Sequence, residues 1–397
     1  ILDRKKDGFS SPNNPNTPNY SGPGDDSFYP GKTINFDAQK VWDRMGKHSV
    51  VAGINWKKES FEQKRRELTN WRNHSSFDST TYPGGLYEIN KGATNNLALF
   101  VQDTYRPNFN WAIYTGLRID RFKKFDGQHV TYDTTNNRYD TVNHGEGSYT
   151  EWSPRLAIEH YVTDSLNVYA SYGHSFNPPP LSQVYRYTDV VRANPNLDPE
   201  RSDTFEVGMK KEWGTKTALN LSAFYVKTKD KVKYVTHYDN NGDVDYKMYE
   251  NVDQETRRGI ELELRHQLSS KWSVFGNYTW QMGRIKHKDL PNTNASGYEE
   301  INYDIPKHIF HAGLEYTNGK WNALWDAQYV SRRQSVDDIT GQYGSSDSYF
   351  ISNVAMNYKF SKEATLQLGI QNVFNRIFYD DEATAGRTYS ASMKFKF

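Results

Sequence analysis

The sequence contains no cysteine among its 397 residues. This absence excludes disulfide bonds and thiolate metal sites, and it is compatible with an oxidising compartment without establishing one. An excess of charge of one sign is also lacking, because 49 Lys and Arg stand against 48 Asp and Glu. A strongly basic surface for nucleic acid is therefore not indicated, and we expect no nucleic-acid partner.

Long hydrophobic runs are missing too. The longest, Leu97–Val101, is far shorter than the roughly 20 apolar residues of a membrane-spanning helix. Hydropathy alone would therefore predict a soluble protein. However, a barrel strand crosses a bilayer when only every second residue is apolar, so the absence excludes spanning helices and nothing more. No signal peptide is visible, and the first residue, Ile1, indicates a processed or incomplete N-terminus.

The signatures of common enzymes are absent as well. The sequence has no Gly-x-Ser-x-Gly, no His-Glu-x-x-His and no P-loop. The acidic groups Asp337–Asp338 and Asp380–Glu382 lack the ligand spacing of a calcium loop, and we interpret them as solvated. We predict a protein that is not an enzyme, with no catalytic residues, no metal site and no cofactor.

What the sequence does contain is strict alternation of apolar and polar residues. In RGIELELRHQ (258–267), Ile260, Leu262 and Leu264 alternate with Glu261 and Glu263, which is typical of a β-strand between an apolar and a polar environment. The same pattern recurs at 219–225, 272–281, 353–360 and 389–397. No long amphipathic helix is evident. We predict an all-β fold.

The connections between these strands alternate in length. Short turns are expected at 44–47, 107–110, 163–165, 214–216, 269–271, 318–320 and 361–363. Longer polar stretches are expected at 61–93, 126–148, 177–201, 236–248, 286–303 and 336–347. In an up-and-down antiparallel meander this rhythm places all short turns at one end and all long loops at the other. About fifteen strands follow from this scheme.

Aromatic residues make up 15% of the chain, and one lies within about two residues of each short turn. At one end of a barrel these residues would form a girdle at the membrane interface. The predicted girdle residues are Trp42, Trp111, Tyr161, Trp213, Trp272, Trp321 and Phe360. A soluble sandwich would instead scatter its aromatics through a core, and open soluble sheets rarely reach fifteen sequential strands. We therefore predict a transmembrane β-barrel.

An odd strand number is unusual, because bacterial single-chain barrels have even counts. Residues 1–31 are rich in Pro, Asn, Ser and Gly and are interpreted as an exposed loop, with the end of a truncated strand possible at 1–9. Residues 32–397 are assigned to the barrel. The chain is thus expected to begin partway through a larger barrel.

Three stretches resemble the TonB-dependent outer-membrane receptors. They are YASYGHSFNPPPL (169–181) leading to NPNLDPERSDTFEVG (194–208), YENVDQETRRGIELEL (249–264), and LGIQNVFNRIFY (368–379) followed by GRTYSASMKFKF (386–397). The resemblance implies a 22-stranded barrel around an N-terminal plug, of which the strands here would be the last fifteen. It also implies that the terminal Phe397 is recognised by the barrel assembly machinery. No plug is recognisable in residues 1–32.

The resemblance further implies a receptor in the bacterial outer membrane, embedded in its lipid, that takes up a scarce nutrient chelate. A ferric siderophore is expected, with energy from the TonB complex in the periplasm. Because such chelates are often anionic and carry flat rings, aromatic and cationic loop residues are the candidate ligands. They are Trp71, Arg72, Tyr82, Tyr87, Tyr185, Arg186, Tyr187, Arg192, Arg332 and Arg333, with Arg65 and Arg66 nearby.

Haem and cobalamin are alternative cargoes, and a plugless passive porin or an adhesion barrel is an alternative class. Haem receptors carry a Phe-Arg-Ala-Pro stretch and an Asn-Pro-(Asn/Asp)-Leu stretch with a histidine between them. Here Asn194–Leu197 matches the second stretch, Phe176–Pro179 departs from the first, and no histidine lies between the two. The histidines that could substitute are His74, His144, His174 and His237.

Overall fold

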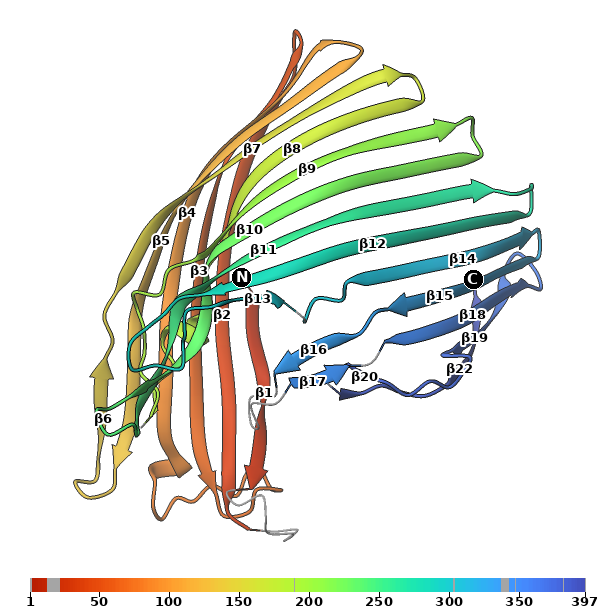
Figure 1. The fold of residues 1–397 in the computed structure, drawn as a ribbon. Coiled ribbons are helices and arrows are strands. Elements are labelled where there is room, and N and C mark those ends of the chain that lie inside the picture. The colour runs from red at the N-terminus through yellow and green to blue at the C-terminus, as the bar shows by residue number, and fades with distance from the viewer. Residues whose placement is uncertain are drawn as a thin grey trace.

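The computed structural model describes residues 2–12, 22–188, 190–302, 304–336, 343–346, 348–380 and 382–396. These residues form one curved antiparallel sheet of eighteen strands (Figure 1). Its strands are β1 (Leu2–Pro12), β2 (Gly24–Met45), β3 (His48–Leu68), β4 (Leu86–Asn108), β5 (Trp111–Asp133), β6 (Arg138–Asn143), β7 (Gly147–Thr163), β8 (Leu166–Asn177), β9 (Glu200–Trp213), β10 (Thr217–Tyr238), β11 (Val244–Gln267), β12 (Trp272–His287), β13 (Glu299–Asn302), β14 (His308–Asn318), β15 (Trp321–Val330), β18 (Tyr349–Lys359), β19 (Ala364–Gln371) and β22 (Thr388–Phe395). The all-β prediction is confirmed.

The strands follow one another as an up-and-down meander. Each pairs with its neighbour in sequence, except that β6 and β13 are short segments that pair only with β5 and β12, respectively. Two small hairpins, β16 (Arg333–Val336) with β17 (Tyr343–Ser346) and β20 (Tyr379–Asp380) with β21 (Glu382–Ala383), lie outside the main sheet. Strands β1 and β22 are the two edges, and no pairing joins them among the described residues.

All seven predicted short turns separate consecutive strands of this meander. The long connections were predicted less well, because several strands continue into them. Strand β3 runs to Leu68 and β4 begins at Leu86, so the predicted loop 61–93 shrinks to residues 69–85. The extension of β3, residues 61–68, carries polar residues on both faces, and the alternation on which the prediction relied is therefore absent there.

The N-terminal region also differs from the expectation. Strand β1 covers Leu2–Pro12, and β2 begins at Gly24 rather than at residue 32. The first strand pairs with β2 in antiparallel register from Leu2↔Thr33 to Pro12↔Gly24. Without the short segments β6 and β13, the sheet contains sixteen strands, one more than the predicted fifteen. The additional strand is β1, in the place where only a strand end was expected.

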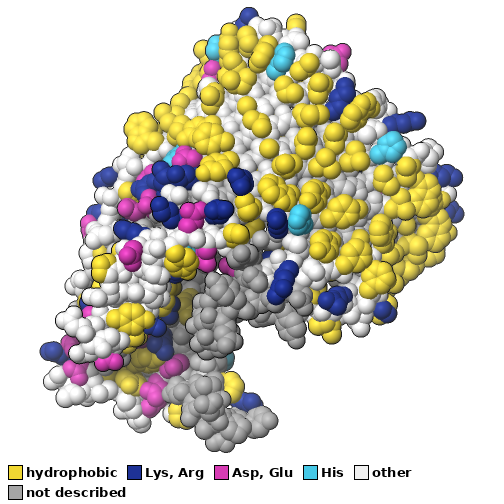
Figure 2. Space-filling view, in the orientation of Figure 1, with side chains coloured by type: hydrophobic (Ala, Val, Ile, Leu, Met, Phe, Trp, Pro, Cys, Tyr) yellow, Lys and Arg dark blue, Asp and Glu magenta, His cyan; other side chains and the backbone are white. Residues whose placement is uncertain are grey.

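The two faces of the sheet differ in chemistry. In β11, Ile260, Leu262 and Leu264 are 45%, 37% and 39% exposed, and they point outward. Their cross-strand partners on β12 include Tyr278 and Trp280, which continue the apolar surface. Figure 2 shows hydrophobic side chains covering the part of this face nearer the short turns, while charged side chains gather toward the long loops. The alternation in the sequence thus produces an apolar outer band.

The predicted girdle residues are all exposed and lie beside the short turns. Several contact an aromatic ring of the neighbouring strand. Trp111 lies 4.1 Å from His160, Trp272 lies 4.7 Å from Tyr316, and Trp321 lies 4.4 Å from Tyr358, measured between ring centroids. The first pair is stacked and the other two are tilted, and such contacts gather large rings at one end of the strands.

No helix of the described residues is long and apolar enough to cross a bilayer. The helical segments are α1 (Leu181–Val184) and the 3₁₀ turn η1 (Pro83–Gly85). The first belongs to the connection between β8 and β9, residues 178–199, named here the β8–β9 loop. This loop contributes Val184, Tyr185 and Leu197 to one small core cluster, and Val235, Val252 and Ala295 form a second one.

Candidate functional site

The β8–β9 loop packs on strands that are distant in sequence. Tyr185 at the end of α1 is fully buried, together with Val184 and Leu197. Its ring lies against Gly92 of β4 and Gly127 of β5, where a Cβ atom on either glycine would overlap it. We call these two glycines and the space between them the glycine socket. A larger residue at either position would exclude the ring.

Three further contacts fix the same loop. Lys124 Nζ of β5 donates a hydrogen bond to the carbonyl oxygen of Leu197 at 2.5 Å. Asn194 Nδ2 donates to the carbonyl oxygen of Tyr249 at 2.8 Å. The backbone of residues 190–192 bonds to Lys247 of β11, with the amide of Lys247 donating to Val190 O at 2.7 Å. The loop is therefore held in its middle and near its C-terminal end.

A chain of polar contacts runs along β2–β5 toward this loop. Tyr87 Oη donates to Asp25 at 2.9 Å, and Arg65 bonds both Asp25, at 3.4 Å, and Glu88, at 2.9 Å. Asn90 Nδ2 donates to Glu88 at 2.6 Å, and Nδ1 of His129 lies 2.8 Å from Asn90 Oδ1. We name these six residues the inner network: Asp25, Arg65, Tyr87, Glu88, Asn90 and His129. Burial of Glu88 and Asn90 is tolerated because each has a partner.

The inner network ends on the β8–β9 loop. The ring of His129 lies 4.7 Å from Tyr187, and Tyr187 lies 5.2 Å from His144. His144 in turn stacks on Tyr185 at 6.2 Å. Burial lowers the pKa of His144 from its usual 6.5, and the neighbouring His129 lowers it further. Burial also raises the pKa of Tyr185 to about 12. Both side chains are therefore neutral near pH 7.

The exposed side of the loop joins two arginines to tyrosines of β10 and β11. The guanidinium of Arg192 lies 3.9 Å above the ring of Tyr246, and that of Arg186 lies 5.9 Å from Tyr234 and 3.5 Å from the hydroxyl of Tyr249. Tyr234 and Tyr249 are themselves 4.9 Å apart. We name this set the Arg–Tyr surface: Arg186, Arg192, Tyr234, Tyr246 and Tyr249. Both arginines are exposed, so their remaining donors face solvent.

An acidic residue, Asp245, lies beside the Arg–Tyr surface. Asp245 accepts a hydrogen bond from Arg192 Nη2 at 3.4 Å, and Arg192 and Asp245 are 55% and 48% exposed. An exposed pair of this kind contributes little to stability, so it leaves Arg192 available for another anion. Lys247 adds a further cation, 5.9 Å from the ring of Tyr234. The surface therefore combines positive charge with flat aromatic faces.

The structure thus brings together only part of the predicted ligand set. Tyr87 belongs to the inner network, Tyr185 and Tyr187 lie at its end, and Arg186 and Arg192 form the Arg–Tyr surface. Tyr185 is a correction, because a fully buried ring in the glycine socket is not open to a ligand. Its partners Gly92 and Gly127 are distant in sequence, and no local pattern marks them.

The remaining predicted residues lie elsewhere. Tyr82 lies 5.6 Å from Tyr87 at the end of the inner network, between ring centroids. Trp71 lies over Gly24, with the guanidinium of Arg72 5.0 Å from its ring. Arg332 follows β15 and Arg333 begins β16. Among the described residues, no hydrogen bond, ion pair or ring contact joins Arg332 to the inner network or to the Arg–Tyr surface.

Sequence reasoning missed the partners of the arginines and the buried polar residues. Tyr234, Tyr246 and Tyr249 were not named, although each falls in or beside the predicted loop 236–248. Glu88 and Asn90 were assigned to a loop, whereas they alternate with Tyr87 and Ile89 on β4. This alternation was the available signal for a strand with a polar inner face. Phe397 and the pair Asp337–Asp338 lie outside the described residues.

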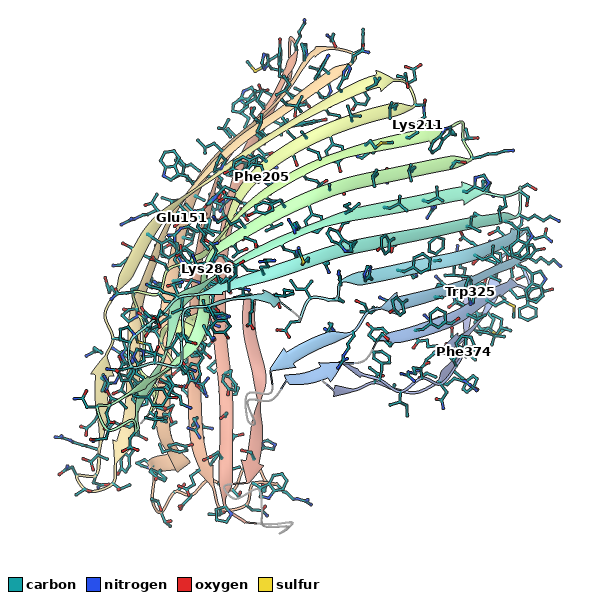
Figure 3. All side chains as sticks on the ribbon, viewed as in Figure 1. Glu151, Phe205, Lys211, Lys286, Trp325 and Phe374 are labelled. Carbon is teal, nitrogen blue, oxygen red and sulfur yellow. The ribbon has the colours of Figure 1, made fainter. Side chains whose placement is uncertain are left out.

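An ion-pair group on the long-loop side of the apolar band was also not foreseen. Arg201 Nη2 donates to Glu151 at 2.6 Å, and Nη1 donates to Asp230 at 2.6 Å. Glu151 is buried on β7, on the long-loop side of Phe205 (Figure 3). Arg201 therefore compensates a buried carboxylate and ties β7 to β9 and β10.

A sheet with one apolar outer face, polar inner contacts and alternating short and long connections has the architecture of a transmembrane β-barrel. Residues 3–373 match the protein family described as "TonB dependent receptor-like, beta-barrel". The chain belongs to this family.

Comparison with curated proteins gives relatives of low identity. The catecholate siderophore receptor Fiu of Escherichia coli (strain K12) is 22% identical over 344 residues, covering 79% of this chain and 42% of Fiu. The ferric-pyoverdine BN7/BN8 receptor of Pseudomonas putida is 25% identical over 252 residues, covering 62% of this chain and 28% of that receptor. The chain thus spans about two-fifths of the length of Fiu.

Solved structures share the fold. The crystal structure of Fiu from E. coli K12 superimposes with a TM-score of 0.68 at 16% identity, covering 94% of this chain and 55% of that chain. The ferric citrate transporter FecA gives a TM-score of 0.66 at 18% identity, covering 96% of this chain and 56% of that chain. At these identities the likeness establishes the architecture and leaves the cargo open.

Proposed function

We propose that the protein containing this chain is a bacterial outer-membrane receptor that takes up a ferric siderophore, with energy supplied by the TonB complex in the periplasm. The Arg–Tyr surface is the observation that carries this proposal. A guanidinium stacked on a tyrosine keeps its donors in a fixed plane for an anionic oxygen. The half-buried tyrosine rings offer part of their flat surfaces to the aromatic rings of a chelate. Names of relatives such as Fiu support the same cargo class.

The arrangement in the membrane is part of the proposal. The outward apolar face would contact lipid, and the aromatics beside the short turns would lie at the periplasmic interface. The long loops with the Arg–Tyr surface would then face the exterior. Completion to 22 strands, and recognition of Phe397 by the assembly machinery, belong to the same proposal. We infer a binding and transport role and no catalytic one.

Haem is the alternative cargo, and the histidines that would have to ligate it have carboxylate or aromatic neighbours. His237 Nε2 lies 2.5 Å from Glu250, and His174 Nδ1 lies 2.8 Å from Asp203. His74 Nδ1 lies 3.1 Å from Asp26, and His144 is packed between Tyr185 and Tyr187. A hydrogen bond at one imidazole nitrogen leaves the other able to bind a metal, so the case against haem rests on the sequence, which has no histidine between Phe176 and Asn194. No comparable feature favours cobalamin or a passive pore.

The proposal is tested by measuring how tightly a ferric tricatecholate binds to the native protein in detergent. Fluorescence quenching or calorimetry gives the affinity. The double variant Arg186→Gln/Arg192→Gln should bind at least about 100-fold more weakly, because two charge-assisted contacts of about 1.5–3 kcal/mol each are lost. The matched control is Arg138→Gln/Arg387→Gln, which removes two exposed arginines that are neither on the Arg–Tyr surface nor among the candidate ligands. Equal affinity of both double variants would contradict the proposal.

Uptake distinguishes a receptor from a passive barrel. Cells that carry the wild-type protein should accumulate the labelled chelate only when the TonB complex is intact. Planar bilayers containing the native protein should show little conductance. Steady large conductance steps, or uptake that persists without TonB, would favour the passive porin.

A further inference from the structure

The outward face of β7–β12 contains an apolar groove whose floor is made by small residues. Cross-strand pairing places Ala170, Val207, Ala223 and Ile260 in one row across β8–β11. The two alanines leave a depression on either side of Val207. The cavity there has a volume of about 490 Å³. The groove lies within the apolar outer face.

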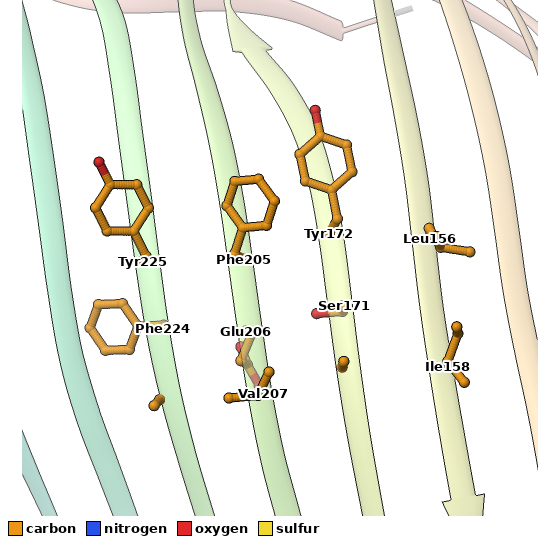
Figure 4. Close-up of a pocket in the computed structure, with 11 residues that line it drawn as sticks. Leu156, Ile158, Ser171, Tyr172, Phe205, Glu206, Val207, Phe224 and Tyr225 are labelled. Atoms are coloured by element: carbon orange, nitrogen blue, oxygen red, sulfur yellow. The ribbon is translucent and has the colours of Figure 1, made fainter.

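The upper edge of the groove, toward the long loops, is a row of large residues. Tyr172, Phe205 and Tyr225 pair directly across β8, β9 and β10, and Tyr225 pairs with Arg258 of β11. Figure 4 shows the three rings side by side on neighbouring strands, with Leu156 and Ile158 along the flank. Rows on one face are about 6.8 Å apart, so the rings stand one row above the alanines. The groove is thus closed above by aromatics and open to the surrounding apolar surface.

Cations continue the pattern above these rings. Lys227 lies two residues beyond Tyr225 on the same face of β10, and the register Lys227↔Thr256↔Arg284 carries its row to β12. Two strand spacings place Lys227 and Arg284 about 10 Å apart. Lys286 follows two residues beyond Arg284, on the long-loop side of Phe205 (Figure 3). With Arg258, these form what we name the cationic row: Lys227, Arg258, Arg284 and Lys286.

Acidic residues balance only part of this charge. Arg284 Nη1 lies 3.1 Å from Glu299, and both side chains are about half exposed. Asp203 pairs in register with Lys227, but its carboxylate accepts the hydroxyl of Tyr172 at 2.9 Å and contacts His174 at 2.8 Å. In the part of the chain that the structure describes, no carboxylate lies within 4.0 Å of the side-chain nitrogens of Lys227, Arg258 or Lys286. Three cations therefore stand above an apolar groove with donors available.

We propose that the groove and the cationic row together bind one phosphorylated lipid of the surrounding outer leaflet. One acyl chain lies over Ala170 and Ala223, and the phosphate lies beside Lys227, Arg258 and Lys286. Basic residues at the edge of the bilayer attract anionic head groups, and the adjoining groove adds apolar contact that a free anion cannot make. This inference rests on the proposed orientation in the outer membrane.

The test uses the full native protein, extracted in mild detergent, and native mass spectrometry with diphosphorylated lipid A as the probe. The triple variant Lys227→Gln/Arg258→Gln/Lys286→Gln should bind the probe roughly 100-fold more weakly, because each cation near a lipid surface contributes about a factor of five. The matched control is Lys216→Gln/Lys271→Gln/Lys320→Gln, which removes three cations at the short turns. That control should bind as the wild type does.

A second variant tests the groove without changing charge. Ala223→Phe should fill the depression and weaken binding about tenfold, whereas Ala391→Phe, on the exposed outward face of β22, should not. An added apolar side chain on a lipid-facing position should leave folding intact, which heat-modifiable gel mobility verifies. Lipid A without phosphates should bind like the triple variant.

The lipid site would be overturned if the wild type, the triple variant Lys227→Gln/Arg258→Gln/Lys286→Gln and Ala223→Phe all retained the probe equally. Equal retention of lipid A with and without its phosphates would overturn it as well. The same samples are assayed for binding of the ferric tricatecholate. Chelate binding without lipid retention would refute only this inference. Lipid retention without chelate binding would support the lipid site and count against the proposed cargo.

Discussion

The ring of Tyr185 occupies the space that a side chain at Gly92 would need, so residues 93 positions apart in sequence share one volume. Gly127 of the neighbouring strand borders the ring on the other side. This contact makes the position of the β8–β9 loop depend on two strand residues that have no side chain.

The first prediction concerns the glycine socket. Gly92→Ala should displace Tyr185 and destabilise the closed position of the β8–β9 loop by about 1–3 kcal/mol, the usual cost of overpacking. Hydrogen exchange of residues 178–199 should therefore accelerate. Gly173→Ala serves as the control, because a Cβ atom there has its nearest neighbour at 4.0 Å. The double variant Gly92→Ala/Tyr185→Ala should show less than the summed effect of its parts; strict additivity would argue against the socket.

The second prediction concerns the outer face. Leu262→Arg places a charge on the apolar band and should reduce the free energy of unfolding by about 2–4 kcal/mol if the residue lies near the bilayer midplane. Glu263→Gln on the opposite face should change it little, because Glu263 has only one exposed amide partner, Asn220, at 3.1 Å. A urea titration of refolding into lipid vesicles measures both. Equal tolerance would mean that the outer face does not contact lipid.

The third prediction concerns Arg201. Its replacement in Arg201→Gln leaves Glu151 buried without its cation and should cost about 2–3 kcal/mol of stability, below the range for fully buried pairs because Arg201 is 28% exposed. Removing the acid as well, in Arg201→Gln/Glu151→Gln, should recover much of that loss. Denaturant midpoints of the single and double variants give the comparison. No recovery in the double variant would show that Arg201 acts through packing and not through charge.

The fourth prediction concerns pH. His144 has a lowered pKa in the folded protein, so its neutral form is favoured by burial. When the loop opens, the pKa returns toward 6.5, and the open state then binds more protons than the closed one. The closed loop is therefore fully favoured above pH 6.5 and loses stability as the pH falls from 6.5 toward the lowered value. Proteolysis of the loop should increase over that window, and His144→Gln should abolish the pH dependence.

Most of the fold could be predicted from the sequence, because strands and short turns are encoded locally. The alternation in 258–267 predicted both the strand β11 and its outward residues. The aromatics beside the short turns predicted a girdle at that end of the sheet. The extension of β3 escaped prediction because residues 61–68 are polar on both faces of the strand. On β4 the alternation of Glu88 and Asn90 with Tyr87 and Ile89 was present in the sequence and was not used.

The candidate site could be predicted only by residue type. Arg186 and Arg192 were chosen for their charge, and the structure shows which tyrosines accompany them. Tyr185 was chosen for the same reasons as Tyr187, yet the two differ in burial because only one faces the glycine socket. Contacts of this kind depend on how a loop folds over distant strands, so a local sequence pattern does not predict them.

The length of the strands has a consequence for electrostatics at the site. From Gln267 at the short-turn end of β11, Tyr249 lies about 60 Å along the strand, or about 45 Å in height at the usual tilt. The apolar band of a barrel is about 25 Å tall, so the Arg–Tyr surface stands roughly 20 Å above it. At physiological ionic strength the Debye length is about 8 Å. In the proposed orientation the negative charge of the lipid surface is therefore screened at the site, and the anionic chelate proposed as the cargo would approach the two arginines without repulsion from the membrane below.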